Sequence, residues 1–292
     1  MRRTFDKPDV HDGAKRDHTV RADERPAPAD KAYKNTVFLD SRDARPLRIL
    51  AEYLEPAARF ERLHVKDTIV FFGSSRIRSR EAAAAELEAA RGGHGDPKAG
   101  DIGYQMSAYY ESARELAHRL SEWSRGLEDP DRRFIVCTGG GPGIMEAASR
   151  GARDAQALNV GLTISIPITE FENPYVTEQL SFEFHYFFMR KFWFTYLAKA
   201  VVVMPGGFGT LDELFELMTL IQTLKMKKRL PVVLFGTGFW DEVINFDALA
   251  RYGLIDKEDL DLFFRTDSVD EAYDYITSAL ADSTVSDNGP SL

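Results

Sequence analysis

Two glycine-rich turns hold the residues whose types and spacing are best suited to chemistry. The first lies in CTGGGPGIMEAASRGA, where Gly140, Gly141 and Gly143 follow an apolar run and precede a helical pattern. The second, MPGGFGTLDELFE, begins at Met204 and makes the same transition into an amphipathic helix. Glycine lets a ligand approach the backbone, and the free N–H groups at a helix N-terminus attract a phosphate. Two such turns in one chain predict a site for a phosphate-bearing ligand.

The second turn offers both backbone and side-chain donors to one phosphate. Gly206, Gly207 and Gly209 would present N–H groups, and the Thr210 hydroxyl would add another donor. Glu213, one helical turn further on, would face the same cleft, where a carboxylate can hold sugar hydroxyls or activate water. The spacing Thr210-x-x-Glu213 is also that of a capping box, in which the two side chains satisfy free helix N–H groups. Local sequence alone favours the cap.

Two further segments add polar side chains. Arg190 and Lys191 lie in the aromatic run FEFHYFFMRKFWFTYLAKA. A planar guanidinium there can grip a phosphate or a base edge, whereas Lys191 is better explained as a side chain that snorkels from a buried helix. Ser74 and Ser75 follow the apolar run TIVFFG, with Arg76 beside them. Their hydroxyls either reach a ligand or belong to an ordinary turn.

A parallel sheet is the element that would bring these turns together. Short β-branched runs alternate with longer helical patterns, which predicts βαβ units and an α/β fold. Ligands bind beyond the carboxyl ends of such strands, where a tight turn leads into a helix. The five predicted strands are residues 68–73, 133–139, 160–166, 200–206 and 231–236.

Helical patterns fill the segments before and between the first strands. PLRILAEYLEPAARFERL places Leu47, Leu50, Leu54 and Ala58 at helical spacing, so we expect a helix that packs on the main domain. Pro56 should interrupt or kink that helix. The next predicted helices are residues 81–91 and 107–123, with the exposed and mobile loop GGHGDPKAGDIG between them.

The two ends of the chain differ in composition from the part between them. Residues 1–44 mix both signs of charge with proline and alanine and show almost no apolar periodicity, which predicts a flexible tail. Residues 45–284 carry the alternating pattern and form the predicted domain. Residues 285–292 predict a frayed C-terminus.

Composition limits the classes of partner. A net charge of -9 and a pI near 5.3 argue against a broad nucleic-acid or anionic-membrane surface. Cys137 is the only cysteine, which excludes an intramolecular disulfide and a multi-cysteine metal site, and a histidine-based metal site is not expected near the turns. The N-terminus lacks the apolar region of a signal peptide, and no segment approaches the roughly 18 apolar residues of a membrane span. We therefore expect a cytoplasmic, metal-free protein.

These motifs resemble those of the LOG family, nucleotide phosphoribohydrolases whose best-studied members release free cytokinin bases from riboside monophosphates. The family's PGGxGTxxE motif is complete from Pro205 to Glu213. Its GGG-x-GxME-type turn is present from Gly139 to Glu146, and its GSS turn from Gly73 to Ser75. The resemblance covers roughly residues 68–250, with the motifs in the same order.

The resemblance implies a fold, a catalytic pair and a set of binding residues. The fold would be a Rossmann-like three-layer α/β fold with a mainly parallel central sheet and helices on both faces. The catalytic pair maps to Arg190 and Glu213. The phosphate-binding or nucleotide-binding set maps to Gly73, Ser74, Gly140, Gly141, Gly143, Glu146, Gly206, Gly207, Gly209 and Thr210.

The implied reaction is hydrolysis of the N-glycosidic bond of a nucleoside 5'-monophosphate to free base and ribose 5-phosphate. Candidate substrates are AMP and an N6-substituted AMP such as a cytokinin riboside monophosphate. This chain has HYFFMRK in place of the MHxRK form and a longer N-terminus than the short plant and bacterial members, so the preferred base stays open. A carrier that binds a nucleotide or a phosphorylated cofactor without turnover is the alternative, because fold alone does not decide function.

Two further expectations concern cofactors and assembly. Members of the family often carry the label lysine decarboxylase, but that chemistry needs pyridoxal phosphate on a Schiff-base lysine. Nothing in the sequence marks such a lysine, so we expect no cofactor. The aromatic run around Arg190 is more apolar than one buried helix face requires, and the family is usually dimeric, so we expect a homodimer or a higher homo-oligomer.

Overall fold

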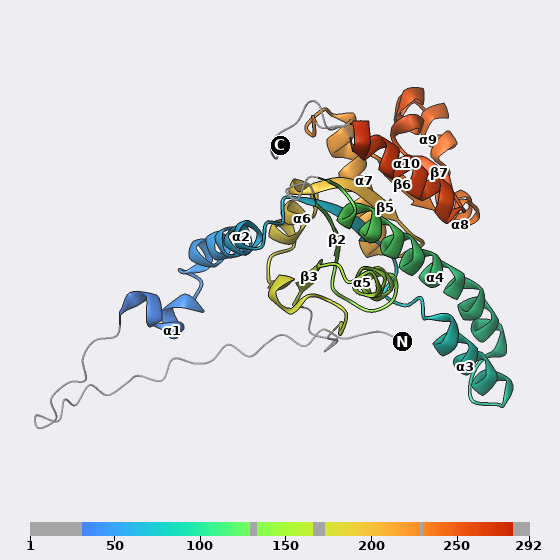
Figure 1. Ribbon diagram of the computed structural model, residues 1–292, viewed down its shortest axis with the longest axis horizontal. Helices are drawn as coiled ribbons and strands as arrows, with labels where there is room; N and C mark the ends of the chain where they lie inside the picture. The colour runs from blue at the N-terminus through green and yellow to red at the C-terminus, as the bar shows by residue number, and fades with distance from the viewer. Residues whose placement is uncertain (1–30, 129–132, 166–172, 228–229, 283–292) are drawn as a thin grey trace, which may run out of the picture. The chain divides into compact units, whose positions relative to one another are not determined.

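The computed structural model describes residues 31–128, 133–165, 173–227 and 230–282 (Figure 1). The chain divides into two units, Met1–Arg45 and Pro46–Leu292. The described part of the first unit contains a 3-10 turn, η1 (Ala32–Lys34), and a four-residue helix, α1 (Thr36–Leu39). These short helices lie in a segment for which the sequence predicts a flexible tail. Residues 1–30 and residues 285–292, for which the sequence predicts a frayed end, lie outside the described residues.

In its described part, the second unit contains a seven-stranded sheet with the order β4-β3-β2-β1-β5-β6-β7. Every neighbouring pair of strands is parallel, which confirms the predicted α/β, Rossmann-like fold class. The strands are β1 (Asp67–Phe72), β2 (Phe134–Thr138), β3 (Asn159–Ile164), β4 (Ser181–Phe184), β5 (Ala198–Val203), β6 (Val232–Phe235) and β7 (Phe264–Thr266).

Side chains alternate across this sheet, and both faces are buried. Along β1, Ile69 and Phe71 join the core on one face, while Val70 and Phe72 join the core on the other. Strands that are covered on both faces consist of continuous apolar runs, which is why the sequence showed five of them plainly. β4 and β7 were missed because β4 alternates exposed and buried residues and β7 has only three residues.

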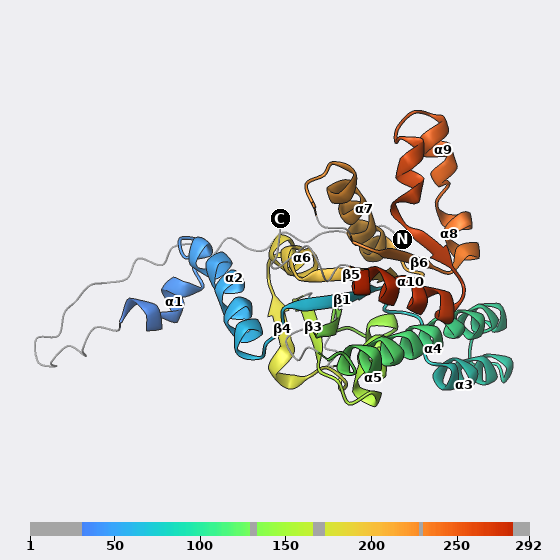
Figure 2. The same ribbon diagram turned by 45° about the horizontal axis from the view of Figure 1, so that its top comes forward.

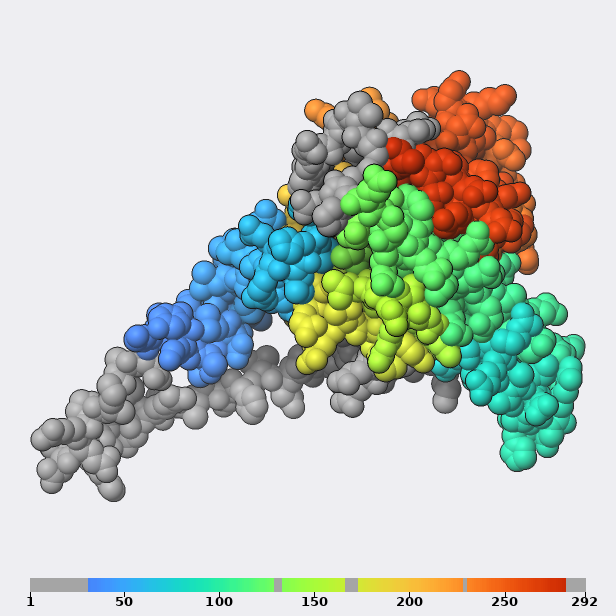
Figure 3. All heavy atoms as spheres, in the orientation of Figure 1, coloured from blue at the N-terminus to red at the C-terminus, as the bar shows by residue number. Residues whose placement is uncertain are grey.

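Helices cover the sheet on both sides, as expected (Figure 2). Those on the face of Ile69 are α4 (Pro97–Arg125), α5 (Ile144–Asp154) and α10 (Val269–Asp282). Those on the face of Val70 include α2 (Arg45–Arg62), α6 (Phe187–Tyr196), α7 (Phe208–Gln222) and α8 (Thr237–Val243). The others are α3 (Arg80–Arg91), α9 (Phe246–Arg251), η2 (Glu178–Leu180) and η3 (Lys257–Leu262). α4 and α5 lie side by side at the surface (Figure 3).

The loop expected between the first two helices is shorter than the sequence suggested. α4 begins at Pro97, because the Asp96 side chain accepts a hydrogen bond from the Lys98 N–H at 3.0 Å and proline suits the first helical position. The helix therefore contains Gly100, which lets α4 approach Leu87 of α3 closely. The predicted mobile loop is wrong from Pro97 onward.

The expectation for α2 is also corrected. The helix runs without interruption through Pro56, which is buried. The helix packs on the domain, as expected, but Leu47, Leu50 and Leu54, whose spacing indicated the helix, are 49%, 50% and 52% exposed. Phe60 faces the core instead, with its ring 5.2 Å from that of Trp193. The leucine spacing correctly indicated a helix, but aromatic packing selected the other face.

Candidate functional site

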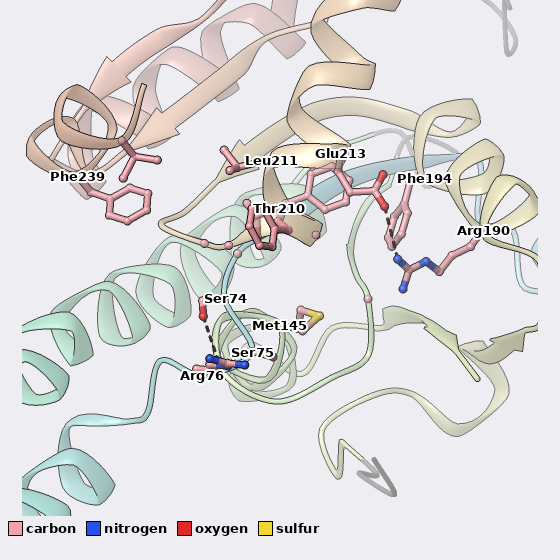
Figure 4. Close-up of a pocket in the computed structure, with 18 residues that line it drawn as sticks. Ser74, Ser75, Arg76, Met145, Arg190, Phe194, Thr210, Leu211, Glu213 and Phe239 are labelled. Atoms are coloured by element: carbon pink, nitrogen blue, oxygen red, sulfur yellow. Dashed lines mark hydrogen bonds and ion pairs between the residues drawn. The ribbon is translucent and has the colours of Figure 1, made fainter. Parts of the chain in front are cut away.

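A cavity of about 730 Å³ opens beyond the carboxyl ends of the central strands (Figure 4). It lies where the sheet order passes from β2 and β1 to β5 and β6. Chain order reverses there, so the crossover helices leave toward opposite faces and open a crevice for a ligand. Of the residues singled out from the sequence, those that line this cavity are Gly73, Ser74, Ser75, Arg76, Arg190, Gly206, Gly207, Gly209, Thr210 and Glu213.

The backbone of Ser74 ties the three turns of the site together. Its N–H donates to the Pro205 carbonyl at 3.0 Å, and its own carbonyl accepts from the Ile144 N–H at 3.0 Å. Its hydroxyl accepts from the Arg76 N–H at 3.1 Å. The serine that follows β1 therefore joins the turn after β5 to the first residue of α5, which fixes the walls of the cavity.

Four residues of the first glycine-rich turn do not line the cavity. Gly140 and Gly143 have φ values of 67° and 70°, a left-handed conformation that favours glycine. A side chain at Gly141 would collide with Met145. Glu146 accepts a hydrogen bond from the Tyr110 hydroxyl of α4 at 2.7 Å. Local conformation accounts for Gly140 and Gly143, and the contact with Tyr110 accounts for Glu146, without a ligand, whereas the Met145 methyl group near Gly141 ends a flexible side chain that can move aside.

The glycines of the second turn fall into two groups. A Cβ atom at Gly206 would lie 2.1 Å from the Thr210 hydroxyl oxygen, so packing within the protein requires glycine there. A Cβ atom at Gly207 or Gly209 would meet nothing within 4 Å, and neither residue has a positive φ. Both line the cavity. Neither packing nor backbone conformation explains these two glycines, whereas close approach of a ligand does.

The N-terminus of α7 is open to the cavity. Its N-cap is Gly207, so Thr210 is the third helical residue and cannot cap the helix. The capping-box interpretation of Thr210 and Glu213 is therefore wrong, and among the described residues no side chain caps this end. The first N–H groups of α7 and the positive end of its dipole are available to an anion.

Arg190 of α6 and Glu213 of α7 meet at one side of the cavity (Figure 4). The Arg190 Nη2 atom lies 3.5 Å from Glu213 Oε1, and the two side chains are 16% and 7% exposed. The guanidinium also lies 5.2 Å from the centre of the Phe187 ring and 5.5 Å from that of Phe194. Aromatic packing thus holds the cation in place while it meets the carboxylate.

Burial dominates the electrostatics of this pair. It raises the pKa of Glu213 to about 7, although the charges of Arg190 and Lys191 lower it. It lowers the pKa of Arg190, against the opposing effect of Glu213. The directions of both pKa shifts indicate that the 3.5 Å contact between the two groups only partly offsets the cost of removing them from water. A carboxyl group with a pKa near 7 can give or accept a proton near neutral pH.

This pKa makes stability depend on pH in a way that can be measured. The pKa of Glu213 is about 7 in the folded protein, above the ordinary value of 4.5, so folding favours the protonated carboxyl. The stability that this carboxyl contributes is therefore fully present below about pH 4.5 and is lost as the pH rises through 7. The free energy of unfolding of the wild type, relative to Glu213→Gln, should therefore fall by roughly 3 kcal/mol over that range. Urea denaturation across pH 4.5–8 measures it. A constant difference would contradict the burial of an ionisable Glu213.

Sequence reasoning missed the apolar part of the lining. Phe239 and Val243 of α8, Met145 of α5 and Leu211 of α7 all contribute to the cavity wall. Phe208, between the two open glycines, is 93% exposed. Apolar residues at helix starts are too common to indicate a site from the sequence.

The described residues give little support to a metal or a pyridoxal phosphate site. They contain no cluster of three or more histidine, cysteine, aspartate or glutamate residues placed to hold a metal ion. The residues that line the cavity include no lysine for a Schiff base. Lys191, which the sequence suggested would snorkel, instead pairs with two carboxylates of α7. None of the described helices is both long enough and apolar enough to span a membrane.

Comparison with known proteins identifies relatives of this chain. Residues 145–276 match the family model described as possible lysine decarboxylase. A pyrimidine/purine nucleotide 5'-monophosphate nucleosidase of Escherichia coli (strain K12) is 33% identical over 117 residues, which are 36% of this chain and 25% of that protein. A cytokinin riboside 5'-monophosphate phosphoribohydrolase of Oryza sativa, LOG, is 30% identical over 148 residues, which are 50% of this chain and 56% of that protein.

The corresponding Arabidopsis thaliana enzyme, LOG2, is 29% identical over 142 residues, which are 48% of this chain and 61% of that protein. The matched segments thus span between a quarter and about three fifths of these relatives. Among solved structures, a molybdenum cofactor binding protein of Rippkaea orientalis has a TM-score of 0.48 and 16% identity, with 74% of this chain and 98% of that one covered. The match of residues 145–276 to this family model and the similarity to the two LOG enzymes confirm the resemblance drawn from the glycine-rich turns.

Proposed function

We propose that this protein hydrolyses the N-glycosidic bond of a nucleoside 5'-monophosphate and releases a free base and ribose 5-phosphate. One observation carries the proposal: the buried Arg190 and Glu213 meet in the same cavity as the uncapped N-terminus of α7. The free N–H groups at this N-terminus would suit an anion, and burial raises the pKa of the neighbouring Glu213 carboxyl to about 7. The names of the curated relatives, which act on nucleoside 5'-monophosphates, agree with it.

In this proposal the 5'-phosphate lies against the N-terminus of α7. Gly207 and Gly209 leave room for its oxygens, and N–H groups of the first turn donate to them. The Thr210 hydroxyl adds a donor on the same turn. Binding through the phosphate would direct the ribose toward Arg190 and Glu213, which lie in the same cavity (Figure 4).

The chemistry would occur at C1' of the ribose. As the bond to the base nitrogen breaks, positive charge develops on the sugar, and the ionised Glu213 stabilises it or holds the ribose hydroxyls. Water then adds its oxygen to C1'; one of its protons stays on the new hydroxyl and the other replaces the sugar on the base. Glu213 directs this water, and Arg190 orients the nucleotide or assists the leaving base.

Incubation with a panel of nucleotides tests the proposal. AMP or an N6-substituted AMP should yield base and ribose 5-phosphate without added metal or pyridoxal phosphate, and adenosine should be turned over far more slowly because it lacks the phosphate. Chromatography of the products measures both. Equal turnover of AMP and adenosine would contradict the phosphate site, and tight nucleotide binding without base release would favour a carrier.

We further expect a cytoplasmic homodimer or higher oligomer. Phe187 and Phe188, at the start of α6, are 51% and 55% exposed, whereas Trp193 and Phe194 of the same helix are buried. Two adjacent exposed aromatic side chains suit an interface between copies of the chain. Sedimentation at micromolar concentration should show a species larger than a monomer, and a monomer would contradict this expectation.

A further inference from the structure

Among the described residues, Lys191 makes the shortest ion-pair contacts between α6 and α7. Its Nζ atom lies 2.7 Å from Asp212 Oδ2 and 2.8 Å from Glu216 Oε2. The lysine side chain is 15% exposed, while those of Asp212 and Glu216 are 57% and 36% exposed. Burial lowers the pKa of Lys191, but its contacts with the two carboxylates outweigh this effect and raise the pKa, so the amine stays charged.

Lys191 and its two partners are close in sequence to Arg190 and Glu213. Lys191 follows Arg190 directly on α6, and its two partners flank Glu213 on α7, one residue before it and three residues after it. Neighbouring residues of one helix therefore contact neighbouring residues of the other. A rotation or slide of either helix that broke the lysine contacts would also separate Arg190 from Glu213.

The pair in the cavity cannot hold this register alone. Its contact is 3.5 Å long, near the limit for a hydrogen bond, and the Arg190 Nε atom is buried without a hydrogen-bond partner among the described residues. The lysine contacts are shorter by 0.7 to 0.8 Å and engage two carboxylates at once. A network of this kind constrains geometry more firmly than one long contact.

We propose that Lys191 is a positioning residue: its ion pairs with Asp212 and Glu216 fix α6 against α7 and so hold Arg190 and Glu213 together. Lys191 does not line the cavity and has no contact with the proposed substrate. Its role in turnover rests on the proposed function, whereas its role in joining the two helices does not.

Measurements of kcat distinguish a positioning role of Lys191 from a purely electrostatic effect of its charge on Glu213. The charged groups that act on Glu213 are Arg190 and Lys191 of α6, and Asp212 and Glu216 of its own helix. If only their charges mattered, Lys191→Met and the double change Asp212→Asn with Glu216→Gln would shift the pH dependence of kcat in opposite directions. Positioning predicts that both lower kcat about tenfold or more with little change in KM. Lys191→Arg, which keeps both ion pairs, should retain most of the wild-type kcat.

Lys199→Met provides a matched control. Lys199 lies on β5, its side chain is 18% exposed and its Nζ atom is 3.7 Å from Asp67, so it is a partly buried, paired lysine outside the cavity. Its replacement should leave kcat unchanged. Normal kcat in Lys191→Met, a change in KM alone, or higher kcat in the double acid variant would overturn the proposal. If Lys191→Met fails to fold, the double change Asp212→Asn with Glu216→Gln and the Lys191→Arg variant still test the proposal.

A second measurement is independent of activity. The coupling between Arg190→Gln and Glu213→Gln in the free energy of unfolding reports their contact directly. That coupling should fall by at least about half when Lys191 is methionine and persist when it is arginine or when Lys199 is methionine. Unchanged coupling would overturn the proposal even if turnover fell. Lost coupling in a protein that releases no base would instead support the positioning role and refute the proposed function.

Discussion

Glu213→Gln should lower the rate of base release from AMP by about 100- to 1,000-fold, the range found when one stabilising or proton-transferring group is removed. Glutamine has nearly the same shape as glutamate but can neither carry a negative charge nor exchange a proton. Affinity for the nucleotide should change less than about threefold, because the proposed phosphate donors belong to the first turn of α7. Single-turnover kinetics and calorimetry measure the two effects separately.

Two comparisons make this test specific. Glu86→Gln removes an exposed carboxylate from α3, outside the cavity, and should leave turnover unchanged. Circular dichroism and thermal unfolding should show that Glu213→Gln is folded. Near-normal turnover by the folded Glu213→Gln protein would show that this carboxylate is not catalytic, and the pairing with Arg190 would then be structural.

Gly209→Ala should weaken nucleotide binding at least about tenfold without destabilising the protein. An added methyl group meets no protein atom within 4 Å but enters the space proposed for the phosphate. Alanine in the first turn of a helix should even stabilise the free protein, by about 0.5–1 kcal/mol. Calorimetric titration with AMP, alongside thermal unfolding of the free protein, measures both changes.

Gly206→Ala is the contrasting variant, three residues earlier in the same turn. Its methyl group would lie 2.1 Å from the Thr210 hydroxyl oxygen, so the loop must shift and the melting temperature should fall. The two variants thus separate a glycine required by packing from one required by a ligand. Unchanged nucleotide affinity in Gly209→Ala would contradict the placement of the phosphate at this helix.

The sequence predicted those parts of the fold that follow from continuous apolar runs. Both faces of β1 are covered, so residues 69–72 form a continuous apolar run and the strand was recognisable. β7 has three residues, and its place is set by pairing with β6 rather than by its own composition. The spacing of the leucines in α2 indicated a helix, but spacing alone does not show which face of the helix meets its neighbours.

Some features of the candidate site could also be predicted from the sequence, and others could not. Glycine-rich turns after strands predicted where a cavity would lie, because parallel strands end at one edge of the sheet. The local spacing of Thr210 and Glu213 favoured a cap, and only the start of α7 at Gly207 excluded it. The contacts of Lys191 join α6 to α7 across more than 20 residues of chain, a relation that local patterns do not contain.

Product analysis with AMP and the wild-type protein tests the central claim most directly. Free adenine and ribose 5-phosphate should accumulate in equal amounts, with no inorganic phosphate and no adenosine, because the proposed reaction breaks only the bond between C1' and the base. Chromatography coupled to mass spectrometry quantifies all four compounds in one sample. Formation of adenosine with inorganic phosphate, or intact AMP bound without any adenine released, would contradict the account.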